Sequence, residues 1–251
     1  MRKLVTLVRN TLRPGYFPVM ARKVFYRFEK NEGPPARDWA SRHAIPFDEY
    51  ALSISPALRE EALLWSEGFK ARASRIVEEV GLDLGGGGSI ELLYMLTRLL
   101  RPAAVLETGV AAGWSSAAIL SALQVNGHGV LYSSDFPYFR YDSPEKLVGV
   151  VVPEHLRDRW HLHLRGDRRN IPAILQEADP FALVHYDSDK SRAGREMVMN
   201  MVRGHLASGA YVVMDDIQHD LFFRDLVSAS SAPWAVIPKQ GEFLLGIIGP
   251  L

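Results

Sequence analysis

Short apolar runs alternate with amphipathic segments from Ala103 to the end of the chain. Such runs are typical of buried strands, and the segments between them have the apolar spacing of helices. We therefore predict seven strands, at 103–107, 129–134, 161–165, 181–187, 210–215, 234–238 and 243–248. Helices are predicted between most of them, at Ser115–Leu123, Pro153–Asp158, Ile171–Glu177, Arg192–Leu206 and Leu221–Ser228. Strands that alternate with helices in this way form a doubly wound, mostly parallel α/β sheet.

Two further helices are predicted before the first strand. Apolar positions recur at helical spacing over 58–80, where Ser55 can cap the start of the helix and Gly81 can end it. A second helix follows the glycines at 85–88, with Ser89 as its cap. We interpret the tetraglycine stretch as a mobile connection, with closure over a ligand as the alternative.

The beginning of the chain is basic, although the whole chain has a formal net charge of zero. Residues 1–37 hold nine Lys or Arg but only two Glu, which leaves the remainder net acidic. We divide the chain into a basic N-terminal arm, 1–54, and one α/β domain, 55–251. The arm is expected to fold against the acidic domain or a dimer partner, with an anionic membrane surface as the alternative. An acidic domain repels phosphates, so nucleic acid is not an expected partner.

The composition, 47% hydrophobic and 23% charged, is that of an ordinary soluble globular chain. Apolar runs long enough to span a membrane do not occur, and Arg9 and Arg13 interrupt the segment where a secretory signal would need an apolar stretch. Cysteine is absent, which excludes disulfides and thiolate metal sites. We expect a cytoplasmic location, with which the lack of cysteine is compatible.

The first predicted strand runs into VLETGVAAGWSS, in which Glu107, Gly109 and Gly113 stand between a strand and a helix. Glycines there let the backbone turn tightly and approach a ligand, and the new helix offers free N–H groups. The spacing is E-x-G-x-x-x-G, which disfavours the G-x-G-x-x-G site for a dinucleotide. The segment also lacks the Gly-Lys-Ser/Thr of a P-loop. The loop is therefore either a ligand site of another kind or a tight turn.

An acidic residue follows each of the next four strands, namely Asp135, Asp167, Asp187 and Asp215. Ligands bind open α/β sheets outside the carboxyl ends of the strands, so four acids at this edge predict a binding site. Asp189 lies two residues beyond Asp187, and carboxylates that close repel each other unless a cation or a hydrogen-bond donor lies between them.

The segments VLETGVAAGWSS, YSSDF, RGD, HYDSDK and YVVMDD together resemble the class I S-adenosylmethionine-dependent methyltransferases. Among these, they are similar to the metal-dependent O-methyltransferases of the catechol and caffeoyl-coenzyme-A type and their relatives in antibiotic and sugar pathways. The resemblance covers about residues 89–250, whereas 1–80 match no family. It implies a Rossmann-like methyltransferase fold with an N-terminal helical extension. It also implies methyl transfer from S-adenosylmethionine to a hydroxyl of a small molecule, such as a phenol, catechol or sugar.

The resemblance also implies which residues contact the cofactor. They are Glu107, Gly109, Gly113 and Ser115 around the methionine and ribose, Asp135 on the ribose hydroxyls, and Asp167 near the adenine. Trp114 is interpreted either as a cover over the adenine or sulfonium, where an aromatic face attracts a cation, or as part of the core.

The resemblance further implies that Mg²⁺ or a similar divalent cation is held by Asp187, Asp215 and Asp216. Oxygen ligands suit this ion, and a hydroxyl bound to it loses its proton more easily. Lys190 and His219 are the alternative general bases. This sequence departs from the family at Asp216, where the usual residue is asparagine. Asp189 is expected either to bind the ion directly or to support its ligands.

Two other functional interpretations also fit the sequence. An apolar strand ending in Asp187-Ser188-Asp189 also fits the D-x-D site of a metal-dependent glycosyltransferase, although the loop after the first strand disfavours it. A methyltransferase fold kept as a non-catalytic binding module is a second alternative. His161 and His163 alternate along one strand and are expected to be structural. The aromatic segment 136–146 is either a lid over the acceptor or a packed loop.

Overall fold

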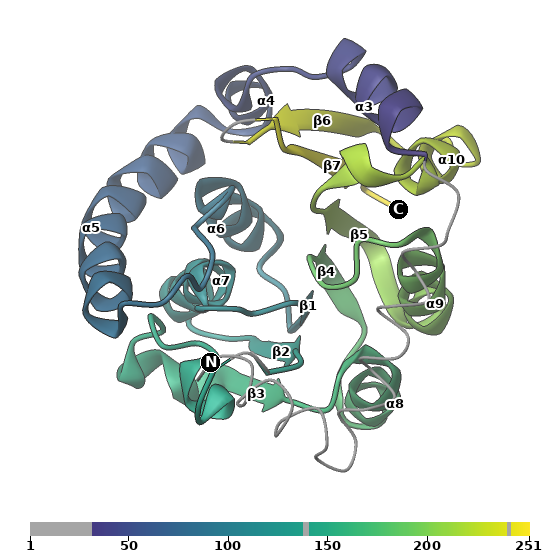
Figure 1. Cartoon of the computed structure of the whole chain (residues 1–251). Helices are drawn as coiled ribbons and strands as arrows, with labels where there is room; N and C mark the ends of the chain where they lie inside the picture. The colour runs from purple at the N-terminus through teal and green to yellow at the C-terminus, as the bar shows by residue number, and fades with distance from the viewer. Residues whose placement is uncertain (1–31, 138–140, 240–241) are drawn as a thin grey trace.

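The computed structural model describes residues 32–137, 141–239 and 242–251, and its centre is a seven-stranded sheet (Figure 1). The strand order is β3-β2-β1-β4-β5-β7-β6, in which β7 runs antiparallel to β5 and β6 while the other neighbours pair in parallel. The strands are β1 (Ala104–Thr108), β2 (Val130–Ser134), β3 (Trp160–His163), β4 (Phe181–Tyr186), β5 (Leu206–Met214), β6 (Trp234–Pro238) and β7 (Leu244–Ile248). All seven predicted strands are present, and the predicted fold class is confirmed.

Helices cover both faces of the sheet, as expected for a doubly wound fold (Figure 1). They are α3 (Gly33–Arg42), α4 (Phe47–Ile54), α5 (Pro56–Val80), α6 (Ile90–Leu100), α7 (Trp114–Asn126), α8 (Asp167–Glu177), α9 (Arg192–Val202) and α10 (Phe222–Ser228). One core lies between the sheet and α6 and α7, with α5 packed outside them, and the other lies beneath α8, α9 and α10. Successive residues of a strand pack into opposite cores. In β1, for example, Val105 belongs to the first core and Leu106 to the second.

The predicted helix ends agree well where a cap fixes them. The Ser55 hydroxyl accepts the N–H of Leu58 at 3.3 Å, and Gly81 ends α5 in the left-handed conformation. Predictions without a strong cap were less accurate. The segment predicted as a helix at 153–158 is a 3₁₀ helix, Glu154–Arg159, and the helix predicted to reach Leu206 ends in a second 3₁₀ turn, Arg203–His205.

Residues 32–54 form two helices that pack on the outer strand of the sheet. Pro34 and Pro35 occupy the first turn of α3, where a missing N–H costs nothing. Trp39 of α3 stacks on Trp234 of β6 with 5.5 Å between ring centroids. Most of the predicted basic arm, residues 1–31, lies outside the described part of the chain, so its docking stays a prediction.

The two histidines of the outer strand β3 contact neighbouring side chains. Strand β3 ends at His163, whose ring lies 3.1 Å from the carboxylate of Glu177, while the His161 ring packs on Tyr132. These contacts agree with the structural role predicted for both histidines.

Among the described helices, none is both long and apolar enough to cross a membrane.

Candidate active site

Four chain segments that follow neighbouring strands form one edge of the sheet. The N–H of Gly109 donates to the carbonyl of Ser134, that of Asp187 to Thr108, and that of Asp215 to Tyr186, each at 2.8 Å. The strand order reverses between β1 and β4, which is where doubly wound sheets bind their ligands. The segments that carry Gly109, Asp135, Asp187 and Asp215 are therefore brought together at this edge.

The loop after β1 requires glycine for two reasons, conformation and space. Gly109 has φ +83°, and a Cβ atom there would lie 2.7 Å from the carbonyl carbon of Asp187. Gly113 has φ +96°, and a Cβ atom there would lie 2.7 Å from the Cα of Gly149. Such close backbone contacts are impossible for other residues without displacement. The loop is thus built against β4 on one side and the segment around Gly149 on the other.

Asp135, the first residue after β2, turns its carboxylate toward this loop. One oxygen accepts the N–H groups of Val110 at 3.2 Å and Ala111 at 3.0 Å, and the other accepts the N–H of Phe136 at 2.6 Å. Burial raises the pKa of Asp135 to about 6, although these hydrogen bonds oppose the rise. Asp135 therefore lies beside the glycine loop, and its contact with a ribose stays a prediction.

Asp167 begins α8 and joins two strand ends. Its carboxylate accepts the hydroxyls of Ser134 and Ser188, each at 2.6 Å. Ser115 lies in the first turn of α7, next to the half-buried ring of Trp114. Both predicted positions therefore lie at the same edge as Asp135.

The last two glycines of the tetraglycine stretch pack against side chains near this edge. A Cβ at Gly87 would lie 2.5 Å from the Trp114 ring, and one at Gly88 would lie 3.0 Å from the Lys239 ammonium nitrogen. The Trp114 ring also meets Phe69 edge-on, with 5.6 Å between centroids. A Cβ at Gly85 or Gly86 would meet nothing within 4 Å, so only the second half of the stretch is packed, and its closure over a ligand stays a prediction.

Glu107 is completely buried and does not open toward the edge. One carboxylate oxygen accepts the hydroxyls of Ser116 at 2.6 Å and Ser133 at 2.7 Å. The other lies 3.7 Å from Nδ1 of His185. The hydrogen bonds of Glu107 therefore join β1, β2 and α7 in the interior next to the site. In this arrangement its carboxylate is not offered directly to a cofactor.

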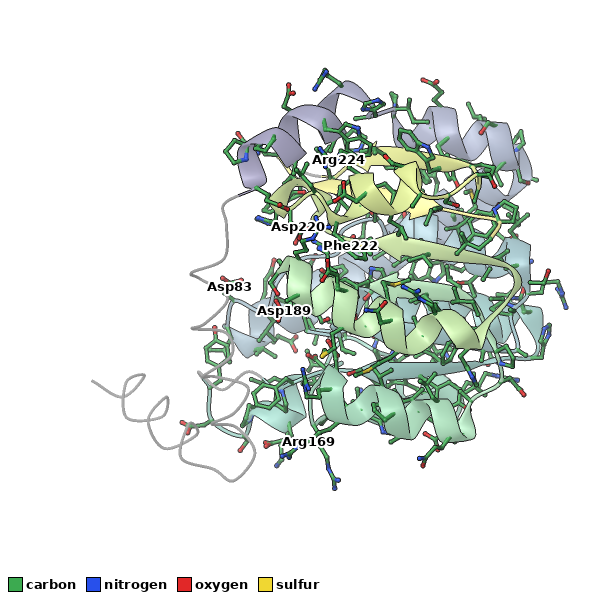
Figure 2. All side chains as sticks on the ribbon, turned by 90° about the vertical axis from the view of Figure 1, so that its right-hand side faces the viewer. Asp83, Arg169, Asp189, Asp220, Phe222 and Arg224 are labelled. Carbon is green, nitrogen blue, oxygen red and sulfur yellow. The ribbon has the colours of Figure 1, made fainter. Side chains whose placement is uncertain are left out.

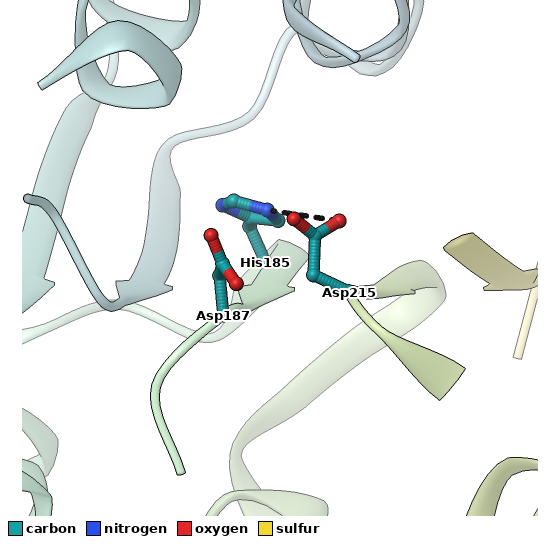
Figure 3. Close-up of side chains that lie close together, drawn as sticks. All are labelled: His185, Asp187 and Asp215. Carbon is teal, nitrogen blue, oxygen red and sulfur yellow. Dashed lines mark ion pairs between the residues drawn. The ribbon is translucent and has the colours of Figure 1, made fainter. Parts of the chain in front are cut away.

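His185 is a site residue that we missed. It offers a ring nitrogen to a group with Asp187 and Asp215, in which the ligand atoms all lie within 4.8 Å of one another (Figure 3). Its Nε2 lies 3.9 Å from Asp215. Burial disfavours the charged ring, but the carboxylates of Asp215 and Glu107 raise the pKa of His185 to about 9. The feature of the sequence that could have indicated His185 is its position as a histidine inside the otherwise apolar strand FALVHY.

Two lysines neutralise the acids of this cluster. Lys190 forms an ion pair with Asp187, and its Nζ lies 3.1 Å from Asp216. Lys239, which follows β6 and was also missed, places its Nζ 2.5 Å from Asp215. Burial acts to lower the pKa of Lys190, but Asp187 and the other acids outweigh it and raise the pKa. Lys190 is therefore an ammonium ion in this arrangement, which makes it a poor general base.

Arg195 of α9 fixes the backbone of Asp215 and Asp216, and we did not predict this role. Its buried guanidinium donates to the carbonyl oxygens of Asp215 and Asp216 at 2.9–3.0 Å and pairs with Asp220 at 2.9 Å. Asp216 adopts the left-handed conformation with φ +56°, which these bonds help to fix. The signal was present, because Arg195 shares the helical spacing of the buried residue Val198 on the inner face of α9.

The remaining predicted residues lie around the cluster. Asp189 accepts the N–H of Ser191 at 3.0 Å, which places its carboxylate at the start of α9 and outside the group of His185, Asp187 and Asp215. Figure 2 shows Asp189 and Asp220 on the side of the molecule toward which the parallel strands point. His219 is exposed for much of its surface in the turn after Asp216, and partial burial of its ring lowers its pKa below the ordinary value.

Comparisons with known proteins agree with the fold. Residues 106–217 match the family model described as a methyltransferase domain. The O-methyltransferase TomG from Streptomyces achromogenes, solved with its cofactor, is similar with a TM-score of 0.58 and 19% identity, over 73% of this chain and 90% of that one. The O-methyltransferase from Bacillus cereus, solved in complex with SAH, is similar with a TM-score of 0.54 and 14% identity, over 84% of this chain and 100% of that one. No curated protein matches the chain.

Proposed function

We propose that this chain, which carries a methyltransferase domain on the class I methyltransferase fold, transfers a methyl group from S-adenosylmethionine to a hydroxyl of a small molecule. The observation that carries the proposal is the position of Asp135 beside the glycine loop at the reversal of strand order. The structural relatives solved with S-adenosylmethionine or its product support the choice of cofactor. Phenol, catechol and sugar hydroxyls are the proposed acceptor classes.

The proposed reaction needs a base for the acceptor hydroxyl and a cation beside its oxygen. The ordinary pKa of histidine already lies below 7 and that of His219 is lowered, so its ring is mainly neutral at pH 7 and can take the proton. The oxygen then forms a bond to the methyl carbon while the carbon–sulfur bond breaks, and the electron pair stays on sulfur. Lys190 supplies positive charge close to the acids that border the acceptor. Catalysis then consists mainly of positioning and charge stabilisation.

A divalent cation, which the resemblance implies, fits this site poorly. The carboxylates of Asp187, Asp215 and Asp216 are the right donors for Mg²⁺, and Asp215 has one buried oxygen without a hydrogen-bond partner among the described residues. However, ammonium groups already contact all three acids, from Lys190 and from Lys239. A metal ion at the same oxygens would be repelled by both. We therefore assign no step of the reaction to a metal.

Titration calorimetry with S-adenosylmethionine tests the proposed function. We expect wild-type protein to bind it and Asp135→Asn to bind it about 10–100-fold more weakly, because hydrogen bonds to a charged acceptor contribute roughly 1.5–3 kcal/mol. The affinity of wild type is also expected to fall as the pH decreases through 6, since Asp135 becomes protonated there. The Asn variant should lack this pH dependence. Failure of wild type to bind the cofactor, combined with binding of a nucleotide-sugar, would favour the glycosyltransferase alternative.

His219→Gln tests the proposed base. In a panel of catechols, phenols and sugars, wild type is expected to release S-adenosylhomocysteine with at least one acceptor. The variant should be slower by a factor of about 10²–10⁴, with unchanged cofactor affinity. His155→Gln is a matched control, because His155 is exposed on the 3₁₀ helix Glu154–Arg159, away from the acids. Equal rates for the two variants would remove His219 from the reaction. Cofactor binding without turnover of any acceptor would favour a non-catalytic module.

A further inference from the structure

Two lysines from different parts of the sheet converge on the three carboxylates expected to hold a metal. Lys190 comes from the segment after β4 and contacts Asp187 and Asp216. Lys239 comes from the end of β6, and its Nζ lies 2.5 Å from one oxygen of Asp215 and 3.9 Å from an oxygen of Asp216. Each acid therefore has an ammonium neighbour, and Asp216 has two.

The Lys239 side chain is built into the site, because it is only 13% exposed. The N–H of Lys239 donates to the carbonyl of Phe243 at 2.8 Å, which fixes its backbone at the end of β6. Gly88 packs directly on the side chain, where any Cβ atom would clash with the Lys239 stem. The position of this ammonium is thus set by a strand on one side and by the tetraglycine stretch on the other.

The charges at this cluster also favour ammonium groups over a metal ion. Lys190 and Lys239 offset most of the negative charge of the three acids, and buried His185 lies 3.9 Å from Asp215 on the other side. Adding a doubly charged ion within a few ångströms of these cations would require at least one lysine to leave, and a lysine that left would lose its carboxylate partners. An ammonium has three N–H donors, so Lys239 keeps donors for a further oxygen while it contacts Asp215.

We propose that Lys239, together with Lys190, takes the place of a divalent cation in this enzyme and that its ammonium group binds the acceptor oxygen. The inference rests on the proposed methyl transfer. In that reaction the acceptor hydroxyl gives its proton to His219 and its oxygen bonds to the methyl carbon, while Lys239 stabilises the charge that develops on the oxygen. The reaction then requires no metal.

The test is calorimetric titration with Mg²⁺ and measurement of metal content, using wild type, Lys239→Met and Lys239→Arg. Wild type is expected to contain no stoichiometric metal and to bind no Mg²⁺ up to millimolar concentration. Lys239→Met removes the ammonium from Oδ2 of Asp215, whose Oδ1 already has no hydrogen-bond partner among the described residues, so it is expected to gain Mg²⁺ affinity by at least about tenfold. Lys239→Arg keeps the positive charge and should gain none.

Lys70→Met is the matched control. Lys70 is 48% exposed and forms an ion pair with Glu91 alone among the described residues, so its loss removes a charge without uncovering a cluster of acids. Thermal unfolding reports whether each variant folds, and Lys239→Gln replaces Lys239→Met if the latter does not. We expect the folded Lys239 variant to gain Mg²⁺ affinity and Lys70→Met to gain none. Loss of packing alone would not produce this difference.

Two results would overturn the inference. One is tight, stoichiometric Mg²⁺ binding by wild type, and the other is a folded Lys239→Met or Lys239→Gln variant that gains no Mg²⁺ affinity. Titration with S-adenosylmethionine separates this failure from that of the proposed function. Wild type that binds both the cofactor and Mg²⁺ is a metal-assisted methyltransferase, whereas wild type that binds no cofactor contradicts the proposed function itself.

Discussion

An Arg195→Met variant is expected to lose about 3–5 kcal/mol of unfolding free energy, because removing one partner of a buried ion pair leaves the other charge uncompensated. The guanidinium is completely buried, and Asp220, its partner at 2.9 Å, is 6% exposed. The carbonyl oxygens of Asp215 and Asp216 would also lose their donors. Thermal unfolding should show a decrease in Tm of roughly 10 °C for a chain of this size.

Arg192→Met is the matched control on the same helix. Its side chain is 36% exposed and pairs with Glu196 and Asp225 at the surface, where ion pairs contribute less than about 1 kcal/mol. A second comparison uses Arg195→Met with Asp220→Asn. The double variant should be more stable than Arg195→Met alone, since no unpaired buried carboxylate remains. Equal losses for Arg195→Met and Arg192→Met would contradict the role assigned to the buried guanidinium.

Arg195→Met should also weaken the site beyond its effect on stability. Asp215 and Asp216 take their positions from the carbonyl contacts of this arginine, and Asp216 is held in the left-handed conformation. With any acceptor that wild type methylates, the variant is therefore expected to lose turnover at temperatures where it is still folded. Its affinity for S-adenosylmethionine should change less, because Asp135 follows β2 and the glycine loop follows β1.

Gly109→Ala is expected to lose about 2–5 kcal/mol of unfolding free energy and to abolish cofactor binding. The added methyl group meets the backbone of Asp187, and overpacking of this kind costs roughly 1–3 kcal/mol. The left-handed backbone at φ +83° adds about 1–2 kcal/mol for a residue other than glycine. The variant can fold only by moving the loop away from β4, which displaces the N–H groups that face Asp135.

Gly127→Ala separates the two causes. Gly127 ends α7 with φ +78°, but a Cβ atom there would meet nothing within 4 Å. The expected loss is therefore the conformational part alone, about 1–2 kcal/mol, with cofactor binding unchanged. Chemical denaturation of both variants and titration with S-adenosylmethionine are the measurements. A Gly109→Ala variant that binds the cofactor as wild type does would show that the close approach to Asp187 is not needed for the site.

The strands, most helices and the position of the site could be predicted from local sequence, because these features depend on residues near one another in the chain. Apolar runs bounded by turns predicted all seven strands, and the Ser55 cap and Gly81 fixed both ends of α5. The glycines and acids after the strands were expected at one edge of the sheet and lie there, since in a parallel sheet all carboxyl ends meet at the same edge. The local sequence did not show which side chains form ion pairs or hydrogen bonds with one another across that edge.

The sequence by itself thus determined the class of fold and the edge at which Asp135, Asp187 and Asp215 lie. Only the tertiary structure decided that Glu107 points into the core, that Arg195 holds the carbonyls of the acids, and that Lys239 reaches Asp215 from β6. Each of these depends on strand order and on contacts between residues far apart in the chain, such as the separation of 24 residues between Asp215 and Lys239. The local pattern of apolar and polar residues carries no information about such pairs, because it records burial and not the identity of the neighbour.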